Sequence, residues 1–426
     1  MSYIFFAIVL IAFVVAGARE VAWDGAGETK SPMQAMVDAM LGAADTSVTL
    51  AIGLVGVMAL FLGLMKVAEQ GGLLLVIARV MRPLMVRLFP DVPADHPAMG
   101  AMILNMSANV LGLGNAATPF GIRAMEELDK LNPLKGTASN AMVLFLAINT
   151  ASVTVLPTSV IALRAAAGST DPAGVIPTTL FATIVATGVA ILVAKIGQNW
   201  WPATQGDVEI EISVRPTSEE TAEINDVRPY PEWASYLTLV GIVALIPITV
   251  IFGRAISPWI VPGLMVALLG FGIARGVNIY EAFVEGAREG FTIALRIIPY
   301  LVAILVAVAM FRTSGALEMT IGPLALLTEP LGLPAEALTM TLLRMLSGSG
   351  ALGYLASMLN DPAIGPDSYT GYLVSTIQGS TETTFYVLAV YFGAVGVKRI
   401  RHALVAGLTA DVAGVIASAV AVWLMI

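Results

Sequence analysis

The sequence has no cysteine and only two histidines among its 426 residues. Disulfide bonds are therefore excluded, and a zinc, haem or iron–sulfur site held by side chains is not expected. Charge is also scarce, because 12% of the residues are Asp, Glu, Lys or Arg, which is about half the share in an average soluble domain. This amount of charge is too small to cover a surface that faces water. An ordinary cytosolic enzyme is therefore excluded.

Apolar residues are abundant instead, at 57% of the chain, with a mean hydropathy of +0.85. Runs of about 20 apolar residues predict membrane spans. They occur at 3–18, 46–65, 140–163, 177–196, 233–252, 258–274, 292–311, 370–394 and 402–426. The first run has no basic residue before it, which favours a retained helix over a cleaved signal peptide. The prediction is an all-α polytopic protein of the lipid bilayer. No basic block or aromatic-basic pattern suggests a nucleic-acid partner.

Two further apolar stretches are interrupted by glycine. Residues 97–131 contain a turn at Leu111–Pro119, with a second helix predicted to begin at Pro119, and residues 336–359 are interrupted at Ser347–Gly350. Each half is about 12 residues long, too short to cross a bilayer. Both stretches therefore predict re-entrant helical hairpins, whose turns must be buried in protein or line a cavity.

An acidic segment separates two related halves. Residues 199–232 contain eight acids and two arginines, so their net charge of −6 accounts for most of the −8 of the chain. Too few apolar residues are present there for independent folding, which indicates a linker. The predicted organisation is an N-terminal helix, a first repeat, the linker, a connecting helix pair and a second repeat, at 1–30, 31–197, 198–232, 233–276 and 277–426.

Each half has a long apolar helix, a hairpin, a broken helix and a final apolar helix. In the first half, residues 72–89 carry three arginines at helical spacing and predict a helix along the membrane surface. With the N-terminus in the cytoplasm, 16 of the 22 Lys and Arg residues fall on the cytoplasmic side. The equivalent helices 46–65 and 292–311 then run in opposite directions. The halves are predicted to be inverted repeats, as in many secondary transporters.

Polar residues concentrate at the interruptions of the first half. Four of them line or flank the hairpin turn, and three interrupt the helix that Pro157 is expected to break: Asn105, Asn109, Asn115 and Thr118, then Asn149, Thr150 and Ser152. Asparagine supplies fixed donors and acceptors, which suit an uncharged or zwitterionic small molecule. Hydroxyl groups in membrane helices commonly bond backbone carbonyls, and we expect this of Thr154, Thr158 and Ser159.

The interruptions of the second half carry charge as well as hydroxyl groups. The candidate binding residues are Ser347, Ser349, Gln378, Ser380, Thr381, Glu382 and Thr383. Within an apolar span, Glu382 is interpreted as a proton carrier, a cation ligand, or an ion-pair partner of Arg344 or Arg312. Asp411 is a second acid in an apolar helix, and Arg296 is its candidate partner.

Enzyme motifs are weak in this sequence. Gly348-Ser349-Gly350 follows no predicted strand, as a nucleophile elbow requires, and neither histidine is placed to serve Ser349. The glycine run 112–115 lacks the strand and the downstream acid of a dinucleotide site, and no Walker lysine follows a glycine loop. We therefore predict a protein that is not an enzyme and has no cofactor or metal.

Longer strings in the chain resemble a known family. Residues 111–121, Asn140 and 146–150 are similar to spore maturation protein A, and residues 297–300, 346–353, 365–368 and 378–386 to spore maturation protein B. The chain thus resembles the two proteins fused. The resemblance implies membership of the nucleoside-recognition (Gate) superfamily, with the concentrative nucleoside transporters and the membrane part of ferrous iron transporter B. The chain lacks the GTPase domain of that iron transporter and a cysteine pair for iron.

The function expected is transport of a small polar solute, nucleoside-like or similar, across a bacterial cytoplasmic membrane by a secondary transporter or permease. Coupling to H⁺ or Na⁺, the solute and homo-oligomer formation stay open at this point, as does whether the host forms spores. An alternative is a membrane scaffold for envelope or spore maturation that transports nothing. It predicts internally satisfied Asn and Glu pairs and no cavity. An intramembrane hydrolase is the third hypothesis. It ranks last because it needs a base near Ser349, and neither histidine is placed to supply one.

Overall fold

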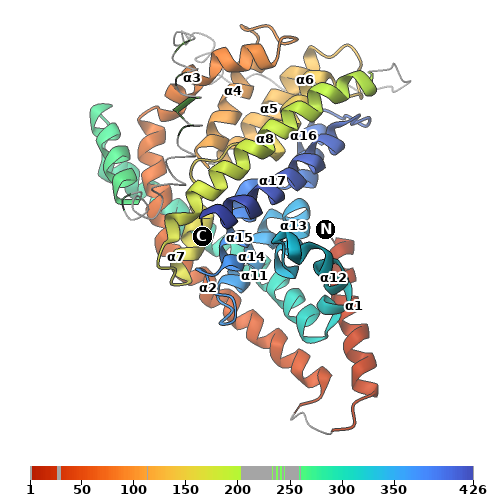
Figure 1. Ribbon diagram of the computed structural model, residues 1–426. Helices are drawn as coiled ribbons and strands as arrows, with labels where there is room; N and C mark the ends of the chain where they lie inside the picture. The colour runs from red at the N-terminus through yellow and green to blue at the C-terminus, as the bar shows by residue number, and fades with distance from the viewer. Residues whose placement is uncertain are drawn as a thin grey trace.

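The computed structural model describes residues 2–25, 30–112, 114–202 and 261–425, with isolated positions between 233 and 259 (Figure 1). Regular structure in these residues is helical, apart from one isolated bridge between Thr137 and Arg399. The predicted all-α fold is confirmed. Most of the acidic linker and the predicted span 233–252 lie outside the described residues.

The same order of helices occurs twice. After α1 (Ser2–Val21), the first half has α2 (Pro32–Gln70), α3 (Leu73–Leu88), α4 (Pro97–Val110), α5 (Gly114–Lys130), α6 (Asn140–Thr150), α7 (Thr158–Ala166) and α8 (Val175–Trp200). The second half has α11 (Ile279–Thr313), α12 (Ala316–Thr328), α13 (Ala335–Leu346), α14 (Gly348–Leu359), α15 (Tyr369–Ser380), α16 (Thr384–Ala394) and α17 (Ala403–Met425). Short 3₁₀ turns occupy Pro172–Gly174 and Glu329–Leu331. The chain is thus a structural duplication.

Local sequence explains the ends of the long helices. Ser31 caps α2 and forms a capping box with Gln34, which satisfies backbone N–H groups of the first turn. The joints that follow α2 and α11 contain Gly72 and Gly315, both in the left-handed region at φ 77° and 81°. Glycine takes this conformation without the steric cost of a Cβ atom. Both long helices therefore lead through the same kind of glycine joint into a short helix.

Three described helices are long and apolar enough to cross a membrane, at Pro32–Gln70, Pro172–Trp200 and Ala403–Met425. Several of their large apolar side chains face outward, among them Leu41, Ile52, Leu192 and Trp423. Outward apolar side chains on long helices suit contact with lipid, because lipid tails are as apolar as the side chains. The protein is therefore a membrane protein, as its composition predicts.

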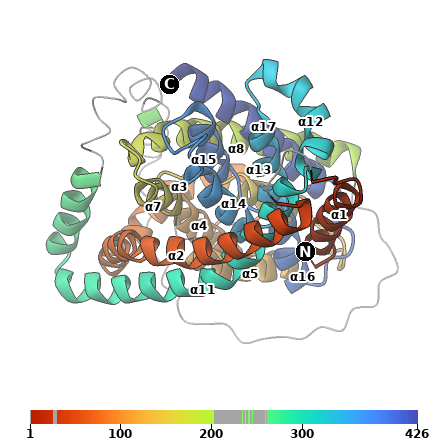
Figure 2. The ribbon, with the colours of Figure 1, turned by 90° about the horizontal axis from the view of Figure 1, so that it is seen from below.

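Two pairs of equivalent helices pack against each other in antiparallel fashion. Along α2 and α11, Gly63 lies against Phe283, Gly286 against Leu62 and Gly290 against Ala59. Figure 2 shows these two helices side by side. Figure 1 shows α8 beside α17, where Gly197 contacts His402 and Ala186 lies near Gly414. Inverted repeats would give this packing. Their inversion across the membrane and the domain boundaries stay predictions.

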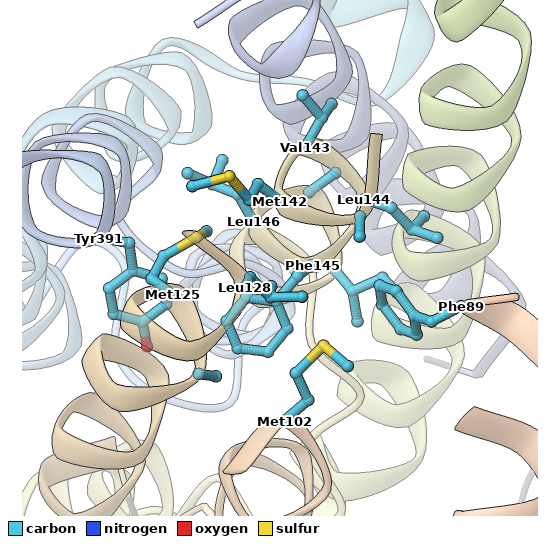
Figure 3. Close-up of a cluster of buried hydrophobic side chains, with 14 of the residues drawn as sticks. Phe89, Met102, Met125, Leu128, Met142, Val143, Leu144, Phe145, Leu146 and Tyr391 are labelled. Atoms are coloured by element: carbon cyan, nitrogen blue, oxygen red, sulfur yellow. The ribbon is translucent and has the colours of Figure 1, made fainter. Parts of the chain in front are cut away.

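The largest buried core joins the first hairpin to a helix of the second half. Figure 3 shows Met102 of α4, Met125 and Leu128 of α5, and Phe145 of α6 packed together. Tyr391 of α16 stacks on Phe145, with ring centroids 6.1 Å apart. Because α16 belongs to the second half, this core fixes the two halves to each other beside the interruptions.

One predicted helix boundary was wrong. The second helix of the first hairpin begins at Gly114 and contains Pro119, which was expected to begin it. Pro119 is the sixth residue of this helix, where proline removes one backbone hydrogen bond, and the helix continues through it. The helix over 140–163 is interrupted, as its hydroxyl residues and Pro157 predict: it ends at Thr150 and resumes at Thr158, so that residues 151–157 are unwound. The second break is shorter, at residues 381–383.

Candidate functional site

The two hairpin turns and the two helix breaks meet at one cavity. Its volume is about 360 Å³. Both halves line it, through Asn109, Gly112, Thr154, Leu156, Pro157, Thr158, Ser159, Val160 and Leu163 from the first and Arg344, Gly348, Leu352, Gln378, Gly379 and Glu382 from the second, with Met58 and Leu62 of α2. Four interrupted elements therefore converge on a common space.

Glycines at the two hairpin turns allow close approach of the breaks. Gly112 has φ 72°, and a Cβ atom there would lie 2.3 Å from the backbone oxygen of Leu156. A Cβ atom at Gly348 would lie 2.9 Å from Oγ1 of Thr383. Each turn thus touches a break directly, Gly112 within the first half and Gly348 within the second.

Backbone hydrogen bonds hold the unwound segments in place. The N–H of Val155 donates to the carbonyl of Val110 at 3.0 Å, and the N–H of Glu382 donates to the carbonyl of Thr150 at 2.8 Å. The second bond joins the break of one half to the helix end of the other. Helices α7 and α14 begin at this cavity, and the positive ends of their dipoles lie there.

An amide network forms the wall contributed by the first half. Asn109 Nδ2 donates to Asn149 Oδ1 at 3.0 Å, and Asn149 Nδ2 donates to the Phe145 carbonyl at 2.9 Å. The hydroxyl of Tyr391 donates to the same Asn149 oxygen at 3.4 Å, and Asn105 Nδ2 lies 3.2 Å from that hydroxyl. The side chains are buried and mutually bonded. Asn109 is the member that lines the cavity.

A partly buried ion pair forms the wall contributed by the second half. Arg344 Nε donates to the Thr381 carbonyl at 2.6 Å, and its Nη2 lies 3.3 Å from Glu382 Oε2. The Arg344 side chain is 9% exposed, whereas that of Glu382 is 44% exposed. Nearby, Gln378 lines the cavity, and its buried Oε1 has no hydrogen-bond partner among the described residues.

The predicted site residues fall into three groups. Asn109, Gln378, Glu382 and Arg344 line the cavity. Another group is buried behind its walls: Asn105, Asn149, Thr150, Ser152, Ser380, Thr381 and Thr383. Ser347 and Ser349 lie at the second turn, with their hydroxyl oxygens 3.5 Å apart, but neither is among the lining residues, and the same holds for Thr118. The Asn115 side chain lies outside the described residues. Their role in binding stays a prediction.

The candidate partners of Glu382 and Asp411 are resolved in part. Glu382 pairs with Arg344, whereas Arg312 pairs with Asp361 at 3.0 Å, so the alternative pairing with Arg312 was wrong. The backbone N–H of Ala363 and the Arg312 guanidinium hold the pKa of Asp361 below its usual value, although burial acts in the opposite direction. The Arg296 side chain, expected near Asp411, lies outside the described residues.

Sequence reasoning missed some cavity residues and one buried cation. Thr154, Thr158 and Ser159 line the cavity, and Thr154 also donates to the Ser152 carbonyl at 3.4 Å, as expected of it. Arg164, 0% exposed, donates to the Pro366 carbonyl at 2.7 Å and lies 3.3 Å from Asp367. The sequence feature that could have identified Arg164 as a buried cation is its position at the end of an apolar helix.

Comparisons with known proteins fit this geometry. A family profile described as Gate, nucleoside recognition, matches residues 51–167 and 294–398. Spore maturation protein A of Bacillus subtilis is 45% identical over 163 residues, covering 38% of this chain and 83% of that protein. Spore maturation protein B of the same organism is 47% identical over 165 residues, covering 39% and 92%.

A solved structure of CNTnw in an outward-facing state is 13% identical, with a TM-score of 0.45, and the match covers 100% of this chain and 98% of that one. The profile match falls on both halves and includes both hairpins and both breaks. One half corresponds to spore maturation protein A and the other to protein B. This chain belongs to the Gate nucleoside-recognition family and joins an A-like and a B-like half in one membrane protein.

Proposed function

We propose that this protein moves a small polar solute across the bacterial cytoplasmic membrane as a secondary transporter or permease. The observation that carries the proposal is the cavity shared by both hairpin turns and both helix breaks. Broken helices that meet between two structural repeats form the substrate sites of many transporters. Unwound backbone at membrane depth is tolerated where it is buried in protein or lines such a space.

The lining chemistry favours a neutral or zwitterionic solute with several hydrogen-bonding groups. Asn109, Thr158, Ser159 and Gln378 offer amide and hydroxyl groups, and the charges of Arg344 and Glu382 offset each other. A volume of about 360 Å³ lies within the usual range of small-molecule pockets. The family description, nucleoside recognition, supports a nucleoside-like solute. Coupling is proposed to use H⁺ or Na⁺.

A membrane scaffold for envelope or spore maturation is the second candidate. The internally bonded pairs Asn109–Asn149 and Arg344–Glu382 favour it, because a scaffold needs its buried polar groups satisfied. The names of the two Bacillus subtilis relatives support it as well. A scaffold does not explain the cavity, however, because it needs no space for a solute. For the hydrolase hypothesis, His402 lies against the Ala194 carbonyl and His96 caps α4, so that neither serves Ser349.

Uptake by the full-length protein in liposomes tests the proposal. Labelled nucleosides, an amino acid and a dicarboxylate are offered separately, and we expect saturable uptake of a nucleoside. Gln378→Ala should weaken apparent affinity about fivefold, because losing one hydrogen bond costs roughly 1 kcal/mol. Gln70→Ala, an exposed glutamine at the end of α2, is the matched control and should leave affinity unchanged.

Folded protein that moves none of these solutes would contradict transport. A scaffold would then be supported if Gln378→Ala and Glu382→Gln alter thermal stability alone. Identical uptake curves for Gln378→Ala and Gln70→Ala would instead overturn the assignment of this cavity as the solute site, because Gln378 lines it.

A further inference from the structure

Asp411 is a buried acid that takes no part in the cavity wall described above. It lies in the middle of α17, and its residue is 1% exposed. Its Oδ2 accepts a hydrogen bond from the Thr384 hydroxyl at 2.7 Å. Its Oδ1 is also buried and has no hydrogen-bond partner among the described residues. Half of this carboxyl group is thus unsatisfied in an apolar span.

The position of Asp411 links it to both helix breaks. On the same face of α17, Gly407 lies against Thr384 and Thr150, and Gly414 lies against Thr381 and Ser380. Thr150 ends α6, and Thr381 begins the second break, where Glu382 donates its N–H to the Thr150 carbonyl. Asp411 therefore lies directly behind the crossing of the two interrupted helices.

Few charged groups face this carboxyl from the elements packed on α17. Helices α6, α15 and α16 contain no acid, lysine, arginine or histidine. The lysine of α8, Lys195, donates to the Leu88 carbonyl, and Glu336 lies in the first turn of α13. Arg344 of α13 is the cation whose electrostatic effect reaches Asp411, and it already bonds Thr381 and Glu382.

An ionised carboxylate in this place would carry a large desolvation cost, since only hydroxyl groups, those of Thr384 and Thr381, act on it and the nearest guanidinium is engaged elsewhere. A metal ion would need several more oxygen ligands, and the described residues contain no group of three His, Cys, Asp or Glu residues that could hold one. A proton on the carboxyl group neutralises it and removes the cost of burying a charge.

We propose that Asp411 holds a proton in this conformation and releases it when the helix crossing opens. On release, the carboxyl O–H bond breaks, its electron pair stays on the oxygen and the proton passes to water. The resulting carboxylate then faces Arg344. Asp411 would thus be the residue that couples proton movement to the rearrangement of the two breaks. The coupling role rests on the transport function proposed above, whereas the protonation state does not.

Infrared spectroscopy of the full-length protein in lipid tests protonation without a transported solute. We expect the C=O stretching band of a protonated carboxyl group, lost as the pH is raised. Asp411→Asn keeps the shape of the side chain and should abolish the band. Glu382→Gln removes the more exposed acid and is the matched control, which should retain the band. Thr384→Val should shift the band without abolishing it, because it removes one hydrogen bond to the carboxyl.

The proposal is overturned if wild-type protein has no such band at acidic or neutral pH, or if the band persists in Asp411→Asn. A band that responds to Na⁺ and not to pH would also overturn it, in favour of a cation. If solute uptake is established, an imposed proton gradient should drive wild-type protein to accumulate solute. Asp411→Asn should accumulate at least tenfold less solute, while it still exchanges solute across the membrane without a gradient. Failure of uptake in the wild type would instead count against the transport proposal alone.

Discussion

The two halves have the same order of helices but build opposite walls of the cavity. In the first half, the break spans seven residues, 151–157, and the neighbouring side chains are neutral amides bonded to one another. In the second half, the break spans three residues, 381–383, and an ion pair replaces the amides. Duplication thus conserves the scaffold, whereas the chemistry differs where the halves meet.

The difference separates a rigid wall from a responsive one. The amide wall is buried, and Asn149 is bonded to α4, α6 and α16 through Asn109, Phe145 and Tyr391. The ionic wall is partly open, because Glu382 is 44% exposed while its partner Arg344 is buried. A buried network of bonded side chains favours one geometry, whereas a half-exposed acid can change its partner.

The outer loops of the halves show a second contrast. The last turn of α7 contacts the loop between α14 and α15 through Arg164, which bonds the Pro366 carbonyl and Asp367. The loop after α16 contacts the loop between α5 and α6 through backbone bonds and Arg401, which donates to the Ala138 carbonyl at 3.0 Å. Each half thus braces the other, one brace with a fully buried arginine and the other with a more exposed one.

The largest expected effect comes from breaking the buried brace. Arg164→Met should lower the free energy of unfolding by about 3 kcal/mol, because the Pro366 and Asp171 carbonyls and Asp367 would lose their shared cation. Arg401→Met should cost about 1 kcal/mol, since water can replace its bonds. Unfolding in detergent, followed by circular dichroism, measures both. Equal losses for the two variants would show that burial does not distinguish the braces.

The next effect tests the contrast between the cavity walls. Asn149→Leu should cost about 2 kcal/mol, because Asn109 Nδ2 and the Tyr391 hydroxyl would lose their acceptor inside the protein. Glu382→Gln should change stability by less than about 1 kcal/mol, since the carboxyl is partly exposed. Thermal unfolding of the two variants, side by side, is the measurement. If Glu382→Gln proved the more destabilising, the ionic wall would be the structural one.

Much of the scaffold could be predicted from sequence, because apolar runs and glycines act locally. Both hairpins and the second break lie where glycine and hydroxyl residues interrupt apolar stretches. The first break also lies where the polar residues and Pro157 predict it, and a tertiary contact holds it open, because Val155 bonds Val110, 45 residues earlier in the chain. Pro119 misled, since the helix begins five residues before it and continues through it.

The site was less predictable, because a polar residue in an apolar helix can bond its own backbone, bond a distant side chain or face the cavity. Asn109 and Asn149 were chosen for their side-chain chemistry, but their bond to each other joins positions 40 residues apart. Thr158 and Ser159 look like Thr339 and Thr409, which bond the carbonyl four residues earlier, yet the first two line the cavity. Arg344 and Arg312 were equally plausible partners of Glu382 until the fold placed Asp361 beside Arg312.

The smallest expected effect is a pH dependence in the loop between α14 and α15. Because the Ala363 N–H and Arg312 hold the folded-state pKa of Asp361 below its usual value of 3.8, this carboxylate stabilises the protein above that value. The contribution should disappear as the pH falls through the folded-state pKa. Asp361→Asn should therefore unfold at a lower temperature than wild type at neutral pH, with the difference shrinking in acid.

Arg312→Met is the control for that pH dependence. It removes the ion pair and leaves the Ala363 N–H bonded to the carboxylate, so part of the acid-dependent difference from Asp361→Asn should persist. Thermal unfolding of the three proteins across acidic and neutral pH measures this. If Arg312→Met abolished the whole difference, the ion pair alone would anchor this loop of the second half. The α5–α6 loop has its own pair, Lys135 with Asp129, which ties it only to the last turn of the shorter helix α5. A purely ionic anchor at Asp361 would therefore sharpen the contrast between this loop and the loop of the second half, which Arg312 ties to the long helix α11.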